Sequence, residues 1–168
     1  MTELTLRDGT RLLVRSLRPT DGPALEAAVE RMSATTRYLR FAAPKPPLTK
    51  TDLDQLLSVD HHDHEALLAY DPVTGDGVAV ARYVRLRDEP DVAELAVTVL
   101  DEWQGRGVGT ALTALLVERA RAEGLHRLRA ITLAENRRAL QMVLRRGFKP
   151  YASSGALVES ELDLARAA

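Results

Sequence analysis

A glycine-rich segment at residues 104–110 has the composition of a phosphate-binding loop. It reads Gln-Gly-Arg-Gly-Val-Gly-Thr, so its glycines stand at alternate positions. Glycine has no side chain to cover the backbone, and the N–H groups of such a segment remain accessible. The apolar spacing of residues 108–123 predicts that a helix begins inside the segment, and a helix N-terminus attracts anions. The segment is therefore expected to bind the phosphate groups of a cofactor.

Two other phosphate-binding loops match the segment less well. A P-loop requires Lys followed by Ser or Thr after its last glycine, whereas Thr110 and Ala111 follow Gly109. A dinucleotide-binding loop requires another glycine at position 112, which is Leu112. Glycine-rich turns also serve as plain helix starts, so the segment alone leaves its ligand open.

Three histidines, at positions 61, 62 and 64, cluster around Asp63. Adjacent residues of an extended loop point in different directions, whereas zinc requires ligands that converge on one point. The chain contains no cysteine, which excludes thiolate zinc sites, disulfides and a cysteine nucleophile. We expect a solvated turn here and no metal site.

The elements that must position these residues follow from the spacing of apolar side chains. Asp8-Gly9 is a hairpin turn signal between two alternating runs. Thr20 or Asp21 is expected to cap the first helix, and Thr49 or Thr51 a later one. In chain order, we predict a hairpin over 3–6 and 11–17, helices over 20–32, 35–41 and 49–57, strands over 65–70, 78–86 and 92–100, a helix over 108–123, a strand over 127–133, a helix over 136–146, and strands over 148–151 and 157–164.

This order of elements predicts one mixed α/β domain over residues 1–168, with a largely antiparallel first half. Pro44, Pro46 and Pro47 predict an extended connector within the domain, because each proline restricts the backbone and removes a donor. The sequence shows no repeat and no linker between domains.

The glycine segment fills the pattern Gln/Arg-x-x-Gly-x-Gly/Ala with Gln104, Gly107 and Gly109. This resembles the coenzyme A pyrophosphate loop of the GNAT superfamily of N-acyltransferases. The order of elements is also that of the GNAT fold, so the resemblance spans nearly the whole chain. It implies a central, mostly antiparallel sheet flanked by helices, with acetyl-CoA as co-substrate.

The resemblance also implies roles for the strand before the loop and for the loop itself. Glu94 would be the general base, because an acceptor amine with a pKa of about 10.4 must lose a proton before it attacks a thioester. The alternative is that Glu94 is a charge on an exposed strand face. The backbone of Val97, Thr98 and Val99 would pair with the pantetheine arm, and one N–H would stabilise the oxyanion. The pyrophosphate would be held by Gln104, Gly105, Arg106, Gly107, Val108, Gly109 and Thr110.

Residues 135–148 are similar to the family's Asn-x-x-Ala…Gly-Phe stretch. This similarity implies that Asn136, Ala139 and Val143 belong to the cofactor site, and Asn136 is also expected to cap its helix. Many members carry a tyrosine where Val143 stands, which protonates the departing thiolate. The general acid could therefore be water or another tyrosine. Water is sufficient in principle because thiols have a pKa of about 8.5, so a thiolate is a tolerable leaving group. The candidates are Tyr38, Tyr83 and Tyr151.

Segments 33–41, 48–53, 59–61 and 80–84 resemble the catalytic domain of bacterial Pat-type protein lysine acetyltransferases. This implies direct acetyl transfer, in a ternary complex, to a primary amine that is preferably a protein lysine. His62 would then line the acceptor site. Acetylation of a small amine such as an antibiotic, polyamine or amino acid is the enzymatic alternative. A non-catalytic acyl-CoA sensing module is the alternative from another class.

The composition argues against nucleic-acid and membrane partners. The 23 basic and 24 acidic residues are interspersed and give a net charge of −1, so no basic field attracts a phosphate backbone. No apolar stretch approaches the about 18 residues of a membrane span, and the N-terminus lacks the pattern of a signal peptide. We expect a cytoplasmic protein that is a monomer or homodimer.

Overall fold

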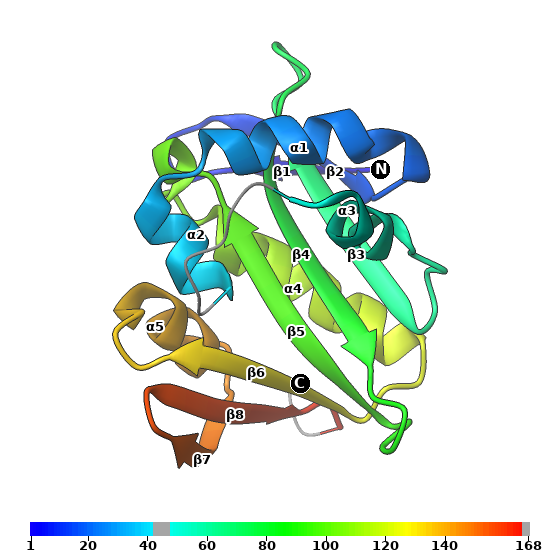
Figure 1. Ribbon diagram of the computed structural model, residues 1–168, viewed down its shortest axis with the longest axis vertical. Helices are drawn as coiled ribbons and strands as arrows, with labels where there is room; N and C mark the ends of the chain where they lie inside the picture. Colours follow the sequence, from blue (N-terminus) through cyan, green and yellow to red (C-terminus); the bar gives the residue numbers. More distant parts are fainter. Residues whose placement is uncertain (42–47, 166–168) are drawn as a thin grey trace.

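The computed structural model describes residues 1–41 and 48–165 and shows a single eight-stranded sheet with helices on both faces (Figure 1). The strand order is β1-β2-β3-β4-β5-β6-β8-β7. The β5–β6 pair is parallel, and all other neighbouring pairs are antiparallel. The strands are β1 Thr2–Thr5, β2 Arg11–Ser16, β3 His64–Tyr70, β4 Gly77–Arg85, β5 Val92–Val99, β6 Arg127–Leu133, β7 Lys149–Ser154 and β8 Leu157–Asp163. The expected mixed, mostly antiparallel architecture is confirmed.

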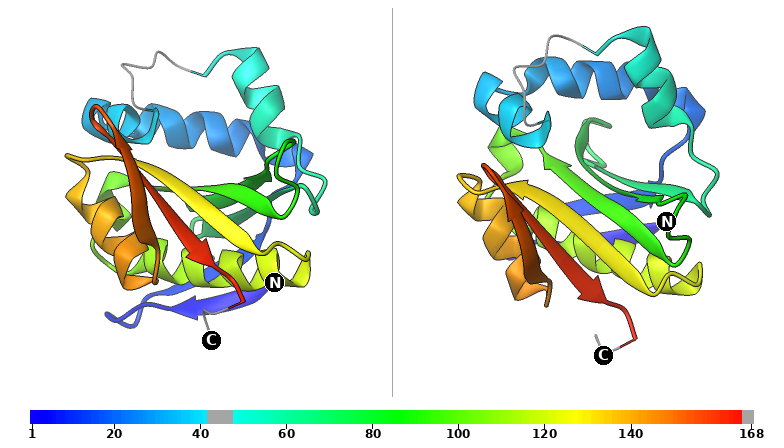
Figure 2. Two further views of the ribbon diagram at one scale, coloured as in Figure 1. Left: turned by 90° about the horizontal axis from the view of Figure 1, so that it is seen from below. Right: turned by 60° about the horizontal axis from the view of Figure 1, so that its bottom comes forward.

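The helices divide between the two faces of the sheet (Figure 2). One face carries α1, α2 and α3, and the other carries α4 and α5. Two short 3₁₀ turns, η1 and η2, precede α1 and the glycine segment. The bounds are η1 Pro19–Asp21, α1 Gly22–Arg31, α2 Ala34–Phe41, α3 Lys50–Leu57, η2 Asp101–Trp103, α4 Val108–Ala122 and α5 Arg137–Arg145. The connector expected at Pro44, Pro46 and Pro47 lies outside the described residues.

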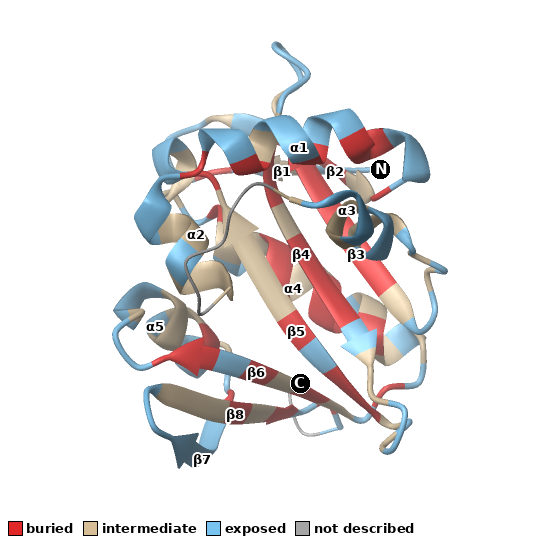
Figure 3. Cartoon of the chain, in the orientation of Figure 1, coloured by how far each residue is buried: buried red, intermediate tan, exposed pale blue. Residues whose placement is uncertain are grey.

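The main core fills the space between α4 and the sheet. Alternate residues of β4 and β5 turn their side chains to this face, and the apolar stripe of α4 covers them. Tyr83, Leu112 and Leu116 are fully buried there, in the central region that Figure 3 colours as buried. Burial of apolar surface on this scale is the main stabilising contribution to such a fold.

A second, smaller core lies on the opposite face, beneath α1 and α3. Leu25 of α1 packs with Leu17, Ala66 and Leu68, and α3 adds partly buried leucines. The outer surfaces of these helices are exposed (Figure 3). The face of β4 and β5 under α1 and α2 is therefore covered less completely than the face under α4.

Two of the expected helix caps are confirmed. The Thr49 hydroxyl accepts a hydrogen bond from the Asp52 N–H at 3.1 Å, which begins α3. The Asn136 side-chain oxygen accepts one from the Ala139 N–H at 3.2 Å, which begins α5. Both side chains satisfy a backbone donor that has no partner within the helix.

The expected cap at Thr20 or Asp21 is wrong. Residues 19–21 form a 3₁₀ turn, and α1 begins only at Gly22. The Asp21 carboxylate instead receives two hydrogen bonds from the Arg15 guanidinium, at 2.7 and 2.8 Å, and one from the Arg18 N–H at 2.7 Å. The bidentate pair with Arg15 engages both carboxylate oxygens of Asp21, so this side chain binds β2 and does not cap α1.

The terminal strand β7 is longer than expected. The sequence predicts a strand over 148–151, whereas β7 continues to Ser154 and pairs with β8. All its residues are exposed, so it carries no apolar alternation that would mark its end. None of the described helices has both the length and the apolar character needed to cross a bilayer.

Candidate active site

The two central parallel strands diverge beyond their first residues. β5 and β6 pair only from Val92 with Arg127 to Leu95 with Ala130. From there β6 continues alongside β8, while β5 continues alongside β4, so the arrows of β5 and β6 spread apart (Figure 1). The edge of β5 that faces β6 is therefore unpaired from residue 96 to residue 99.

The direction of each backbone group on this edge follows from the pairing with β4. Leu100 donates its N–H to Val78 at 3.0 Å, and the Val92 carbonyl accepts from Leu86 at 2.9 Å. Because antiparallel pairs alternate, the even-numbered residues of β5 bond to β4 and the odd-numbered residues face the open edge. Val97 thus presents its N–H and carbonyl to a ligand and Val99 its N–H, since the Val99 carbonyl accepts from Gln104, whereas the backbone of Thr98 is directed to β4.

The glycine loop continues directly from this open edge. Gly105 and Gly107 adopt left-handed angles, with φ of 75° and 91°, and a Cβ added at either would meet nothing within 4 Å. No described residue accepts a hydrogen bond from the backbone N–H groups of residues 105–110, and α4 begins at Val108. Free donors, open space and a helix N-terminus together suit the loop to bind a pyrophosphate.

Gly109 differs from Gly105 and Gly107, because it allows α4 to pack closely and does not leave open space around the backbone. A Cβ at this position would lie 3.2 Å from the Met142 sulfur and 3.4 Å from a methyl of Val99. The absence of a side chain therefore allows α4 to approach β5 and α5 closely. The Val108 side chain is likewise in the core, at 1% exposure, so only the backbone of Val108 faces a ligand.

Arg106 anchors the loop to the first hairpin. Its guanidinium lies 4.4 Å from the centroid of the Trp103 ring and donates to the Thr10 hydroxyl at 2.6 Å. It also forms an ion pair with Asp8 at 2.7 Å. Hydrogen bonds from Thr10, and then from Arg106, lower the pKa of Asp8 to about 2. The Arg106 side chain thus stabilises the loop from the side of the hairpin.

Gln104 joins three elements around the open edge. Its amide nitrogen donates to the Val99 carbonyl at 3.1 Å and to the Thr36 hydroxyl of α2 at 3.2 Å. Its amide oxygen accepts from Arg138 of α5 at 3.2 Å. Gln104 therefore fixes the end of β5 and the start of the loop. Thr110, at the far end of the loop, is exposed.

The residues expected on α5 differ in their surroundings. Asn136 uses its oxygen as the helix cap, which leaves its amide N–H groups for a ligand. Ala139 is half-buried beside it. Val143 is only 2% exposed and packs in the main core. The expected cofactor contact at Val143 is not supported by this burial, because its side chain belongs to the same buried cluster as Phe148.

Glu94 lies exposed on β5, on the face that carries α2 and Thr98. No described residue forms a hydrogen bond or an ion pair with its carboxylate. Arg40 of α2 donates its Nε hydrogen to the Thr98 hydroxyl at 2.9 Å, and the Glu94 charge acts on this guanidinium. The Glu94 carboxylate thus has no hydrogen-bond or ion-pair partner among the described residues, and it lies beside the unpaired part of β5.

Only one of the three candidate tyrosines lies near this edge. Tyr83 is fully buried, its hydroxyl donates to the His62 carbonyl, and burial raises its pKa to about 12. Tyr151 lies on β7 and donates to Glu159. Tyr38 lies on α2, where a hydrogen bond to the Glu135 carboxylate raises its pKa. Glu135 directly precedes Asn136, so Tyr38 lies beside the expected cofactor site.

The histidine cluster disperses over different partners. The Nδ1 atoms of His61, His62 and His64 lie 2.9 Å from Glu65, 2.7 Å from Glu123 and 2.7 Å from the Ser58 carbonyl, respectively. His62 therefore lies at the C-terminal end of α4, away from α2. Within residues 1–41 and 48–165, no three His, Asp or Glu side chains are grouped to hold a metal ion.

Comparison with known proteins identifies the family. Residues 28–148 match the acetyltransferase (GNAT) family. The chain belongs to the GNAT acetyltransferase family. The resemblance seen in the glycine segment and in the order of elements is thereby confirmed.

Individual GNAT acetyltransferases match over most of the chain. The GNAT domain of S. lividans PAT superposes with a TM-score of 0.91, at 30% identity over 96% of both chains. Acetyltransferase PA5475 of Pseudomonas aeruginosa is 31% identical over 86% of this chain and 78% of its own length. Acetyltransferase Pat of Mycolicibacterium smegmatis is 32% identical over 95% of this chain, which spans 47% of that protein.

The sequence analysis of this GNAT acetyltransferase missed two arginines on the Glu94 face. Arg82 is only 7% exposed and lies on β4 opposite Ala96. Arg40 reaches the same face from α2. A single arginine inside the apolar run 78–84 was the available signal, because a charged residue is seldom fully buried without a specific reason.

Proposed function

We propose that this protein transfers the acetyl group of acetyl-CoA to a primary amine by direct attack in a ternary complex, with Glu94 as general base. The observation that carries the proposal is the continuity of three features. The unpaired edge of β5, the free N–H groups of residues 105–110 and the free carboxylate of Glu94 adjoin one another. This arrangement suits a long phosphorylated thioester and an amine that meets it at the strand.

Acetyl-CoA would supply the activated acyl group. The N–H groups of residues 105–110 would hold its pyrophosphate, with Gln104 and Arg106 fixing the loop from outside. The backbone groups of Val97 and Val99 would hold the pantetheine arm as an added strand does. The Asn136 amide would reach the same arm from α5.

Glu94 would accept the proton that the acceptor amine must lose. A protonated amine has no free electron pair, so deprotonation has to precede formation of the new N–C bond. A backbone N–H of Val97 or Val99 would stabilise charge that develops on the thioester oxygen. As the C–S bond breaks, Tyr38 or water would return a proton to the sulfur.

A protein lysine is the acceptor that we propose. The resemblance of residues 33–41 and 80–84 to Pat-type enzymes supports it, as does the similarity to PAT of S. lividans over 96% of both chains. A small-molecule amine is the alternative acceptor, and the pocket described below bears on that choice. A protein that binds acyl-CoA without catalysis is the alternative from another class.

Substitution of Glu94 by glutamine tests the proposal. We expect Glu94→Gln to lower kcat by about 10²- to 10⁴-fold, while the Kd for acetyl-CoA in calorimetry stays unchanged. Glu3→Gln on β1 is the matched control, since it removes an exposed strand carboxylate on an edge strand that β2, β3 and β4 separate from β5. Undiminished turnover in Glu94→Gln would refute its role as base. Acetyl-CoA binding with no turnover on any amine or lysine peptide would favour the sensing module.

A further inference from the structure

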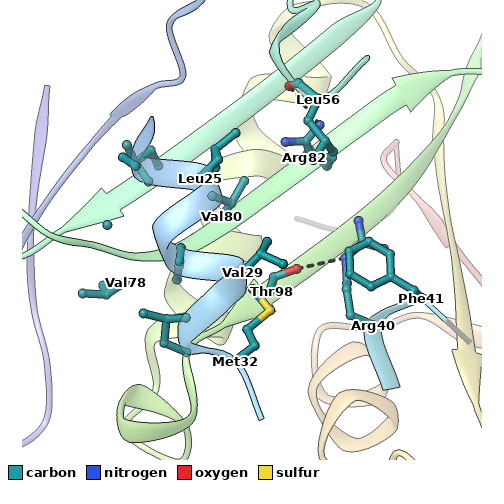
Figure 4. Close-up of a pocket in the computed structure, with 16 residues that line it drawn as sticks. Leu25, Val29, Met32, Arg40, Phe41, Leu56, Val78, Val80, Arg82 and Thr98 are labelled. Atoms are coloured by element: carbon teal, nitrogen blue, oxygen red, sulfur yellow. Dashed lines mark hydrogen bonds between the residues drawn. The ribbon is translucent and has the colours of Figure 1, made fainter. Parts of the chain in front are cut away.

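A pocket lies between α1, α2 and the sheet, on the face of β5 that carries Glu94 (Figure 4). Most of its wall is apolar. Leu25 and Val29 of α1, and Met32 directly after it, point toward the strands, where Val80 of β4 lines the opposite side. Thr98 of β5 also lines it, so the pocket reaches the strand on which the proposed reaction takes place.

Two arginines are the charged residues of this wall. Arg40 donates to Thr98 at 2.9 Å, and Arg82 donates to the Leu56 carbonyl at 3.2 Å (Figure 4). Arg82 also approaches the Nε2 atom of His64 at 3.2 Å. Among the described residues that line the pocket none is acidic, and neither arginine has an ion pair in the part of the chain that the structure describes.

These two cations are costly to bury: desolvation lowers the pKa of Arg40, and the Glu94 charge offsets this only in part. Desolvation, and then the nearby charge of Arg40, lower the pKa of Arg82 to about 10. Desolvation and the charge of Arg82 also lower the pKa of His64. Buried charges in proteins are as a rule paired, and two like charges in one apolar wall oppose each other. A guanidinium has five N–H donors, and most of those of Arg40 and Arg82 have no partner among residues 1–41 and 48–165.

We propose that this pocket binds the acceptor substrate through a carboxylate held between Arg40 and Arg82, with an apolar group of the acceptor against Leu25, Val29 and Met32. The inference rests on the proposed function and adds the substrate class. A bare ammonium would be repelled by the arginines, whereas a carboxylate neutralises them and carries the linked amine toward Glu94. Arginine suits this role because its planar fork matches a carboxylate.

Two kinds of acceptor carry both an amine and a carboxylate, and the experiment distinguishes them. One is a free apolar amino acid, whose amine and carboxylate are joined by one carbon. The other is a peptide in which an acidic residue adjoins the target lysine. In both cases the acceptor should lose affinity when its carboxylate becomes an amide, because the two guanidinium groups then lack a counter-charge.

The test compares each acceptor with its neutral counterpart on the same enzyme. Acetylation kinetics are measured for leucine, methionine and phenylalanine against their amides, and for lysine peptides with an adjacent glutamate against the glutamine peptides. We expect at least one carboxylate form to have a kcat/KM about 10- to 100-fold above that of its partner, the range of a charged hydrogen bond. The pair that shows the difference identifies the source.

Substitution of the two pocket arginines then tests whether the difference in kcat/KM arises in the pocket. Arg82→Met and Arg40→Met should each reduce the preference for the carboxylate form to within about threefold, with the Kd for acetyl-CoA unchanged. Arg7→Met, at an exposed arginine before the Asp8 turn, is the control and should retain it. Equal kcat/KM for both forms of every pair in the wild type overturns the proposal but leaves acetyl transfer intact. A preference that survives in both variants also overturns it. Acetyl-CoA binding with no acetylation of any acceptor overturns the proposed function instead.

Discussion

Arg106 of the glycine loop lies 2.7 Å from Asp8 of the β1–β2 turn, although 98 residues separate them in the chain. The same guanidinium stacks on Trp103 and donates to Thr10. These contacts hold the loop by a side chain and leave its backbone N–H groups for a ligand. The N-terminal hairpin therefore belongs to the support of the loop, even though it contributes no group to the reaction.

The Asp8 contacts predict a specific pH dependence of stability. The pKa of folded Asp8 is about 2, below the ordinary 3.8, so the ionised form favours the folded state. This stabilisation is complete about one unit above the unfolded pKa of 3.8 and is lost as the pH falls toward 2. We expect Asp8→Asn to lower Tm by a constant amount above about pH 5, and the difference from wild type to shrink between pH 4 and pH 2. Thermal denaturation followed by circular dichroism at each pH measures it. A difference in Tm that stays constant down to pH 2 would contradict this prediction.

Gly107 offers a test of the anion site with a control glycine that also has positive φ, 91° against 58° at Gly155. Gly107→Glu places bulk and negative charge where the pyrophosphate is expected, so acetyl-CoA affinity should fall by at least about 10²-fold. Gly155→Glu in the β7–β8 turn is the control, because both glycines have positive φ and open space around Cβ. It should keep the affinity of the wild type in calorimetry. Equal affinity in the two variants would place the phosphate elsewhere.

Much of this fold could be predicted because its signals are local. Apolar runs mark β3, β4 and β5, and a helical stripe marks α4, whatever else the chain contains. The glycine segment could be predicted for the same reason, since a glycine-rich turn before a helix leaves backbone N–H groups accessible to an anion. The Asn136 cap is equally local, because its partner lies three residues away.

The features that could not be predicted depend on residues distant in the chain. Gly107 and Gly109 look alike in sequence, yet one supplies a left-handed turn and the other a close helix contact. Arg40 and Arg82 meet only after α2 packs over β4. The place of Val143 in a motif predicts a cofactor contact, but its side chain is buried in the main core. Tertiary packing, which periodicity does not encode, determines each of these outcomes.

Substitution of Gly109 is expected to reduce the stability of the fold and not to remove a contact with acetyl-CoA directly. A valine there would press on the Met142 sulfur and on Val99, which already lie 3.2 and 3.4 Å from the Cβ position. We expect Gly109→Val to reduce the free energy of unfolding by about 1–3 kcal/mol, the usual cost of overpacking. Gly109→Ala should cost less, because the flexible Met142 can move by a few tenths of an ångström. Urea denaturation measures both, and equal stability of the two variants would contradict the close packing.

Tyr38 is the tyrosine that the structure favours as proton donor to the leaving sulfur. Its hydroxyl is hydrogen-bonded to Glu135, which raises its pKa above the usual 10, so it stays protonated throughout the neutral range. We expect Tyr38→Phe to lower kcat by about 10- to 100-fold, less than loss of a base, because a thiolate also accepts a proton from water. Tyr151→Phe, which removes a hydroxyl from the distant β7, should leave kcat unchanged.

A purely structural role of Tyr38 gives a different pattern. If Tyr38 only joins α2 to the loop before α5, then Glu135→Ala breaks the same contact and should lower kcat as much as Tyr38→Phe does. If Tyr38 donates the proton, Glu135→Ala leaves the hydroxyl in place and removes the charge that raises its pKa. The rate of Glu135→Ala should then stay near that of the wild type at neutral pH, and its alkaline limb should move to lower pH. Steady-state kcat measured from pH 6 to pH 11 for both variants distinguishes the two roles.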